Sequence, residues 1–209
     1  MFTGIVTAIG TIASVEQRGD LRVRIACPFD PARIAIGASI ACSGVCLTVV
    51  ERGGEAGAAW FCVDVSAETV SRTAKDLWRE GRRLNLEPSL RLGDELGGHI
   101  VTGHVDAVGR VHDWMPEGDS MRAAIAAPPE LARFVAAKGS ITLDGVSLTV
   151  NSVSDRPDGS VIFGLNIIPH TADVTTLGEL RQGGEVNLEV DTIARYLERM
   201  QALRSNAGD

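Results

Sequence analysis

The residues best suited to proton transfer and strong hydrogen bonding are ones that change between two similar halves of the chain. Histidine titrates close to neutral pH, and serine and aspartate form strong hydrogen bonds. The matching positions are Ile5 and His104, Ser43 and Asp144, Cys46 and Ser147, and Glu68 and His170. At three of these four positions the later half carries the stronger acid–base group or hydrogen-bonding group. This pattern predicts that both halves bind the same molecule and that the later half makes it react differently.

Neutral drift is the alternative interpretation of these pairs. For Asp144 we favour a turn role, because Asp-Gly between apolar runs is typical of a tight hairpin turn. For His104 we favour function, because a histidine that begins a strand where its counterpart is Ile5 needs a polar partner.

No metal or cofactor is predicted. His99 and His104 could form a metal-binding pair, but no carboxylate or cysteine has a ligand-like spacing beside them. Gly97-Gly98 is interpreted as a bend between domains, and the sequence contains neither a dinucleotide-binding nor a P-loop motif. The four cysteines lack the spacing of a zinc site and are expected to be reduced and buried, namely Cys27, Cys42, Cys46 and Cys62.

Four blocks of sequence recur in the same order at an offset of 99 to 102 residues. The blocks are residues 3–10 with 102–109, 37–49 with 138–150, 61–69 with 163–171, and 85–87 with 187–189. A drifting offset is expected if short insertions lie in loops. We therefore predict two homologous domains, residues 1–98 and 99–190, followed by a tail at 191–209.

Each half is predicted to consist mainly of strands. Leu21, Val23 and Ile25 alternate with polar or small residues, as in a half-buried strand. Hairpins are expected around Ser43-Gly44 and Asp144-Gly145. Regular glycine and proline punctuation is typical of a small antiparallel barrel or sandwich.

Helical segments are expected at three places. One short helix precedes each hairpin, at residues 31–36 and 131–137. The tail is predicted to form a helix at 192–204 whose apolar residues recur at three-four spacing. Packing on its own domain is one interpretation of this helix, and self-association is the one that we favour.

The chain of 209 residues has a net charge of −7, which disfavours nucleic acid as a partner. Arg79, Arg82 and Arg83 are interpreted as a solvated turn. No apolar run is long enough to span a bilayer, so no membrane partner is expected. The N-terminal residues do not resemble a signal peptide, and we predict a cytoplasmic protein.

Taken together, the repeated blocks and the segments around them resemble the riboflavin synthase family. The resemblance extends over essentially the whole chain. It is carried by residues 1–6 (MFTGIV), 44–49 (GVCLTV), 96–106 (LGGHIVTGHVD), 144–150 (DGVSLTV), 168–171 (IPHT) and 186–191 (VNLEVD).

The resemblance implies an all-β-dominated fold of two six-stranded Greek-key barrels and a C-terminal helix. It implies that two molecules of 6,7-dimethyl-8-ribityllumazine exchange a four-carbon unit, giving riboflavin and 5-amino-6-(D-ribitylamino)uracil without cofactor or metal. It also implies a homotrimer held by the C-terminal helices, with the active site between the first barrel of one subunit and the second barrel of its neighbour. As a further partner it suggests lumazine synthase.

The resemblance also implies the ligand contacts. In the first barrel these are Gly4, Ile5, Val6, Ser39, Cys46, Leu47, Thr48, Asp64, Val65, Ser66, Ala67, Glu68 and Thr69. In the second barrel they are Gly103, His104, Val105, Ser147, Leu148, Thr149, Asn166, Ile167, Ile168, Pro169, His170 and Thr171, with Lys138 near the shared site.

The expected reaction needs one lumazine to lose a proton from its 7-methyl group while the other accepts attack by carbon. His104 is the candidate for proton transfer, and donors at Ser147 and Thr149 can stabilise the resulting anion. Cys46 and Asp191 are expected to assist, and Asp144 completes the predicted catalytic set.

One departure from the family pattern is Pro88-Ser89, which follows Asn85-Leu86-Glu87 where Arg-Ala is usual. It lies at the link between the barrels and concerns how the two barrels are placed relative to each other.

Two rival functions stay open at this point. One is a lumazine- or flavin-binding paralogue without catalysis. The other is a flavin-dependent oxidoreductase, for which the sequence offers no nicotinamide site.

Overall fold

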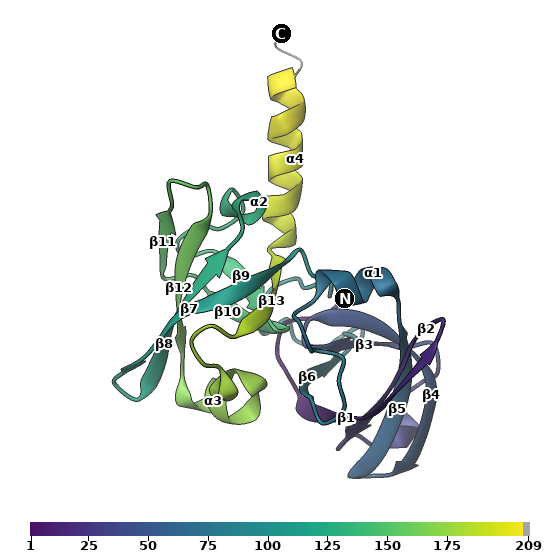
Figure 1. The fold of residues 1–209 in the computed structure, drawn as a ribbon. Coiled ribbons are helices and arrows are strands. Elements are labelled where there is room, and N and C mark those ends of the chain that lie inside the picture. Colours follow the sequence, from purple (N-terminus) through teal and green to yellow (C-terminus); the bar gives the residue numbers. More distant parts are fainter. Residues whose placement is uncertain (207–209) are drawn as a thin grey trace.

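The computed structural model describes residues 1–206, with side chains described as far as Arg204. Thirteen strands dominate this part of the chain, and a long helix follows them (Figure 1). The last three residues of the predicted tail, 207–209, lie outside the described residues. Within residues 1–206, no helix has the length and apolar character needed to cross a membrane.

The first repeat forms a closed barrel of six strands in the order β1-β2-β5-β4-β3-β6. Its elements are β1 (Ala8–Arg18), β2 (Asp20–Cys27), the 3-10 helix η1 (Pro31–Arg33), β3 (Ser39–Cys42), β4 (Val45–Glu55), β5 (Ala58–Val65), α1 (Ala67–Arg72) and β6 (Arg83–Pro88). The predicted strand around Val23 is β2, and the predicted hairpin is β3–β4. Side chains from all six strands fill the interior, with Phe61 fully buried among them.

The second repeat forms a curled seven-stranded sheet in the order β10-β9-β13-β7-β8-β12-β11. Its elements are β7 (Ala107–Glu117), β8 (Ser120–Ala127), α2 (Pro129–Ala132), β9 (Ser140–Leu143), β10 (Val146–Thr149), β11 (Ser152–Asp155), β12 (Val161–Ile167), α3 (Pro169–Val174), the 3-10 helix η2 (Thr176–Glu179) and β13 (Glu185–Val190). Phe163 occupies the core position that Phe61 has in the first repeat.

The extra strand arises because one strand of the first repeat is divided in the second. β4 has a register shift between Val49 and Glu51, where one residue is left out of the pairing. The corresponding residue in the second repeat is Asn151, and there the strand separates into β10 and β11. A bulge in one repeat thus becomes a break in the other. The prediction of six strands per barrel holds for the first repeat only.

The short helices differ in part from those predicted. The segment expected to be helical at 131–137 forms only the one-turn helix α2. Two helices of six residues each, α1 and α3, were not predicted. Ser66 caps the start of α1 by accepting a hydrogen bond from the Thr69 amide, and Pro169 occupies the first turn of α3.

Helix α4 (Thr192–Asn206) follows β13 directly and extends away from the two sheets (Figure 1). Asp191 caps it, because its carboxylate accepts a hydrogen bond of 2.8 Å from the Ile193 amide. The predicted C-terminal helix is therefore confirmed, two residues longer than expected at its C-terminal end.

The chain start lies between the two repeats, where Phe2 is completely buried (Figure 1). Phe2 and Val101 exchange two backbone hydrogen bonds of 2.7 and 3.0 Å. Together with Ala41 and Cys46, these two residues form a small apolar cluster separate from the two main cores.

Candidate functional site

The segments that precede the two sheets cross over, so that each contacts the hairpin of the other repeat. We call residues 2–6 the first glycine segment and residues 101–105 the second glycine segment. The Gly4 carbonyl accepts a hydrogen bond of 2.8 Å from the Ser147 amide, and the Gly103 carbonyl accepts one of 2.8 Å from the Cys46 amide. Packing follows the same exchange, since Val6 contacts the second core and Val105 the first.

This crossing changes the grouping of the predicted contacts. The resemblance assigned Gly4 to the barrel of Cys46 and Gly103 to the barrel of Ser147. The structure places them the other way round. We therefore define the Cys46 site as the first hairpin with the second glycine segment, and the Ser147 site as the second hairpin with the first glycine segment.

Glycine is required at both crossing points. Gly4 and Gly103 have φ angles of +76° and +77°, a region that side chains disfavour. A Cβ atom on Gly4 would lie 2.6 Å from the Ser147 Cβ, and one on Gly103 would lie 2.6 Å from the Cys46 Cβ. The backbone can approach each hairpin this closely only because no side chain intervenes.

Two buried glutamates hold the glycine segments in place. Glu87 accepts hydrogen bonds from the amide and hydroxyl of Thr3 and from the Gly4 amide, at 2.7 to 3.0 Å. Burial raises the pKa of Glu87, while its bonds to Thr3 and Gly4 act in the opposite direction. The Glu87 carboxylate thus supplies the hydrogen-bond acceptors that these backbone amides would otherwise find in water.

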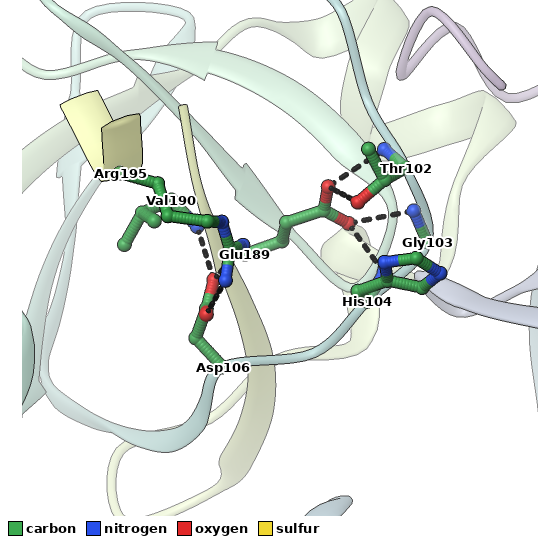
Figure 2. A network of polar contacts seen from close by, with 7 residues as sticks. All are labelled: Thr102, Gly103, His104, Asp106, Glu189, Val190 and Arg195. Carbon is green, nitrogen blue, oxygen red and sulfur yellow. Dashed lines mark hydrogen bonds and ion pairs between the residues drawn. The ribbon is translucent and has the colours of Figure 1, made fainter. Parts of the chain in front are cut away.

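Glu189 does the same for the second glycine segment. It accepts hydrogen bonds from the amide and hydroxyl of Thr102 at 2.7 Å, from the Gly103 amide at 2.8 Å and from the His104 amide at 3.0 Å (Figure 2). Neither glutamate was predicted as a site residue. The repeated Asn-Leu-Glu block contained the signal, although it served there only to align the repeats.

The two hairpin turns meet at the junction of the repeats. Asn85 donates a side-chain hydrogen bond of 2.9 Å to the Asp144 carbonyl, and Asn187 donates one of 2.9 Å to the Ser43 carbonyl. Ser43 and Asp144 have φ angles of +46° and +45°, and each is followed by a positive-φ glycine, as a type I′ turn requires. The two hairpins are therefore locked together through paired polar contacts.

Asp144 belongs to this junction. Its carboxylate accepts a hydrogen bond of 2.8 Å from the Asn187 amide, and the residue is only 4% exposed. Burial raises the pKa of Asp144 to about 6, although the Asn187 amide and the charge of Arg82 act in the opposite direction. The turn role that the sequence favoured for Asp144 agrees with this placement.

His99 contacts the hydroxyl of Ser147. The distance from Nδ1 to the Ser147 Oγ is 2.7 Å, and Nε2 lies 3.4 Å from the Thr142 hydroxyl. Burial lowers the pKa of His99, and the carboxylates of Asp191 and Glu189 partly oppose this shift. Burial therefore favours the neutral form of the imidazole. Gly98 leaves the space for this contact, because a Cβ there would lie 2.1 Å from the Thr3 carbonyl oxygen and 2.9 Å from the Ser147 Cβ.

Sequence reasoning interpreted His99 only as a weak metal candidate. Comparison of the repeats could not find it, because its counterpart would precede Met1. Among the residues that the structure describes, no three His, Cys, Asp or Glu side chains are grouped so as to hold a metal ion.

The Lumazine binding domain family matches the chain twice, at residues 3–89 and 102–191. A riboflavin synthase of Brucella abortus (strain 2308) is 47% identical over 204 residues, covering 96% of this chain and 98% of the relative. A riboflavin synthase of Bacillus subtilis (strain 168) is 34% identical, covering 95% of this chain and 89% of the relative. The chain belongs to the riboflavin synthase family.

Riboflavin synthase is a transferase and catalyses the final step of riboflavin biosynthesis. Among solved structures, LumP complexed with riboflavin has a TM-score of 0.76 and 26% identity, covering 91% of this chain and 99% of that chain. LumP has also been solved with 6,7-dimethyl-8-(1'-D-ribityl) lumazine, at a TM-score of 0.74. Binding of lumazine and riboflavin by this riboflavin synthase is implied by these relationships.

The other predicted catalytic residues are spread over both sites. His104 is exposed at the Cys46 site, with its backbone amide bound by Glu189. Thr149 is exposed at the Ser147 site. Asp191 caps helix α4, as described above. His104 and Ser147 therefore belong to different sites of this riboflavin synthase, although the resemblance grouped them in one barrel.

The two predicted contact segments differ in their polar groups. In residues 64–69, Asp64 is bound by Arg22 through two hydrogen bonds of 2.6 and 3.2 Å. In residues 166–171, Asn166 takes the place of Asp64, and its buried Oδ1 atom has no hydrogen-bond partner among the described residues. His170, the counterpart of Glu68, is exposed in α3. A buried acceptor without a donor is costly unless a ligand supplies one.

A cleft of about 900 Å³ lies beside the first barrel and the segment after β6. Of the predicted contacts it includes only Ile5 and Ser39. Cys46, His104 and Ser147 do not line it. Lys138 lies elsewhere, in a left-handed turn with φ of +67° before β9. Of the two glycine segments, only Thr3 and Ile5 of the first line this cleft in the single chain.

Proposed function

We propose that the riboflavin synthase reaction takes place at the Cys46 and Ser147 sites, each of which binds one lumazine. The crossed hydrogen bonds from Cys46 to Gly103 and from Ser147 to Gly4 carry this proposal, because they give each site parts of both repeats. In it, two molecules of 6,7-dimethyl-8-ribityllumazine exchange a four-carbon unit. The products are riboflavin and 5-amino-6-(D-ribitylamino)uracil.

Positioning supplies much of the catalysis in this proposal. Two lumazines held in fixed register react as an intramolecular pair, which is worth several kcal/mol of the barrier. The buried Asn166 carboxamide oxygen supports this binding mode, because a hydroxyl group of a ribityl chain could donate the hydrogen bond that it lacks. The other predicted contacts from residues 64–69 and 166–171 line the outer ends of the sites in this proposal.

Proton transfer is the role proposed for the Ser147 and His99 pair. The 7-methyl carbon of the bound lumazine loses a proton to the Ser147 oxygen, while the hydroxyl proton passes to the neutral His99 Nδ1. The short contact of 2.7 Å supports this transfer, and burial, which lowers the pKa of His99, favours the unprotonated imidazole that the step requires. Donors at Ser147 and Thr149 then stabilise the negative charge on the ring.

His104 and Cys46 serve the second lumazine. The exposed imidazole of His104 returns a proton as the four-carbon unit is transferred, and Cys46 supports the same ring through its backbone. Comparison of the single variants His99→Gln and His104→Gln separates the two roles. The proposal expects both to lower kcat. If His104→Gln alone did so, His104 and not the Ser147 and His99 pair would perform the proton transfer.

A homotrimer joined by α4 brings the Cys46 site of one copy against the Ser147 site of its neighbour. Five apolar side chains on α4 are 52 to 65% exposed, which supports contact with another helix: Ile193, Tyr196, Leu197, Met200 and Leu203. Sedimentation of Leu197→Glu tests this association, and monomers that keep full activity would contradict it.

Three further points also stay proposals: the domain limits of 1–98, 99–190 and 191–209, a cytoplasmic location, and association with lumazine synthase. Co-sedimentation with lumazine synthase tests the last of them.

Turnover of the lumazine alone is the decisive experiment. The purified protein is incubated with 6,7-dimethyl-8-ribityllumazine, and formation of riboflavin is followed by absorbance and green fluorescence. Riboflavin must appear without any second substrate. Bound flavin without turnover would favour a non-catalytic paralogue, and absence of both binding and product would overturn the proposed sites.

A further inference from the structure

Helix α4 is joined to the segment before β7 by an ion pair with two hydrogen bonds. Arg195 donates to both carboxylate oxygens of Asp106, at 2.6 and 2.9 Å (Figure 2). The Asp106 side chain is only 16% exposed, and that of Arg195 is 37% exposed. A planar guanidinium bound at two points fixes direction as well as distance.

Asp106 also binds the end of β13. Its Oδ2 atom accepts a hydrogen bond of 2.9 Å from the Val190 amide, and its own amide donates one of 2.8 Å to the Leu188 carbonyl. Between these two residues lies Glu189, whose carboxylate holds the second glycine segment (Figure 2). A continuous set of polar contacts therefore runs from α4 to the backbone of His104.

The first repeat does not have this connection. Thr7 is the counterpart of Asp106, and its amide and hydroxyl both donate to the Leu86 carbonyl, at 3.0 and 3.3 Å. Pro88 is the counterpart of Val190, and proline has no amide hydrogen to offer a carboxylate. The departure at Pro88 thus coincides with the repeat that has no helix to connect.

We infer that Asp106 and Arg195 are positioning residues, which tie the orientation of α4 to the placement of His104 at the Cys46 site. Their ion pair holds β13 against residue 106, β13 sets Glu189, and Glu189 sets the amides of residues 102–104. The helix that projects from the chain would then influence the geometry of the site. This inference rests on the proposed role of the Cys46 site.

A merely structural role would be to fasten α4 to the second repeat, and the chain offers a matched control for it. Arg133 and Glu198 form the other described ion pair between α4 and the second repeat, at 2.7 Å, and this pair is not part of the described hydrogen bonds that hold residues 101–106. Arg133→Gln removes that contact and leaves the set from Arg195 to His104 intact.

The test compares Asp106→Asn and Arg195→Gln with Arg133→Gln in the full chain. Because the protein has four histidines, the His104 imidazole can be followed by NMR with ¹³C-labelled histidine and assigned from the His104→Gln spectrum. We expect both pair variants to shift the His104 signal. We also expect them to lower kcat about tenfold, less than the roughly 100-fold loss that a misplacement of about 1 Å can cause. Arg133→Gln should do neither.

Sedimentation and circular dichroism are measured in parallel to check the oligomeric state and the folding of each variant. If Arg195→Gln disturbs folding, Arg195→Lys replaces it, because lysine keeps the positive charge. Partial recovery of the His104 signal in Arg195→Lys supports the inference. An unchanged His104 signal in Asp106→Asn, or an equal change in Arg133→Gln, overturns it. The NMR signal tests this inference separately from the proposed function. If His104→Gln were fully active, the proposed role of His104 would fail, but the signal would still report whether Asp106 and Arg195 position its side chain.

Discussion

The two repeats use the same groups to hold their frames and different groups to finish their sites. Glu87 and Glu189 bind equivalent amides, and Asn85 and Asn187 bridge the junction in equivalent ways. Outside this frame, the Cys46 site has an exposed imidazole, whereas the Ser147 site has a half-buried imidazole bonded to a serine hydroxyl. Two similar scaffolds thus provide two different chemical environments, as the proposed reaction between two copies of one substrate requires.

The largest expected effect tests the shared frame. Gly103→Ala combines an unfavourable positive φ with a Cβ contact of 2.6 Å, and should lower the free energy of unfolding by about 3 kcal/mol. Gly4→Ala should cost a similar amount. Gly183 has a φ of +82° and open space around it, so Gly183→Ala should cost only the conformational part, about 1 kcal/mol. Chemical denaturation measures all three, and equal losses would contradict the crossing geometry.

The next effect concerns the difference between the sites. Ser147→Ala removes the hydroxyl bonded to His99 and should lower kcat about 100-fold, the range found when one stabilising donor is removed. Cys46→Ser makes the first site resemble the second but supplies no counterpart of His99, so its effect should be less than about tenfold. Steady-state kinetics with the lumazine distinguishes these. If Ser147→Ala were as active as Cys46→Ser, the two sites would be chemically equivalent.

Asp144 and Ser43 allow a comparison by pH. Because burial raises the pKa of Asp144 to about 6, its contribution to stability is full below the usual carboxyl pKa near 3.8 and is lost as the pH rises through about 6. Asp144→Asn keeps an acceptor for the Asn187 amide and removes the buried charge. The variant should therefore gain about 1 to 3 kcal/mol in unfolding free energy relative to the parent between pH 4 and pH 7.

The control for this prediction is Ser43→Ala, which removes the uncharged counterpart. Its difference from the parent should stay constant over the same pH range, as measured by urea denaturation. A constant difference for Asp144→Asn as well would show that the carboxyl of Asp144 titrates normally.

The smallest expected effects on stability come from a comparison of the two predicted contact segments, residues 64–69 and 166–171. Asn166→Leu removes a buried acceptor without a partner, so stability should change by less than about 1 kcal/mol while the affinity for riboflavin falls about tenfold. Asp64→Asn weakens a partly exposed ion pair with Arg22 and should also change stability by less than about 1 kcal/mol. Fluorescence titration with riboflavin measures the affinities. A normal affinity in Asn166→Leu would remove this residue from the proposed site.

The sequence was sufficient for features that local patterns encode. The repeat blocks predicted two similar β units, the Ser43 and Asp144 turns have the expected positive φ angles, and α4 begins where predicted. The six-residue helices α1 and α3 escaped because six residues contain too few turns for a periodic signal.

The crossing of the glycine segments could not be predicted, because nothing local distinguishes a segment that contacts its own hairpin from one that contacts the other. For the same reason His99 was not identified, since its partner Ser147 is 48 residues away and its position has no repeat counterpart. Glu87 and Glu189 illustrate a further limit. A charged residue at the end of a strand gives no sign that it will be buried by backbone donors.

The crossing also dictates an order of events during synthesis. Phe2 and Gly4 are synthesised 99 and 143 residues before their respective hydrogen-bond partners, Val101 and Ser147. The first barrel can close while its own leading segment is still without its final contacts. Phe2, which is fully buried in the folded protein, therefore lacks part of its packing until Val101 has emerged, and chaperones would have a clear apolar target there until then.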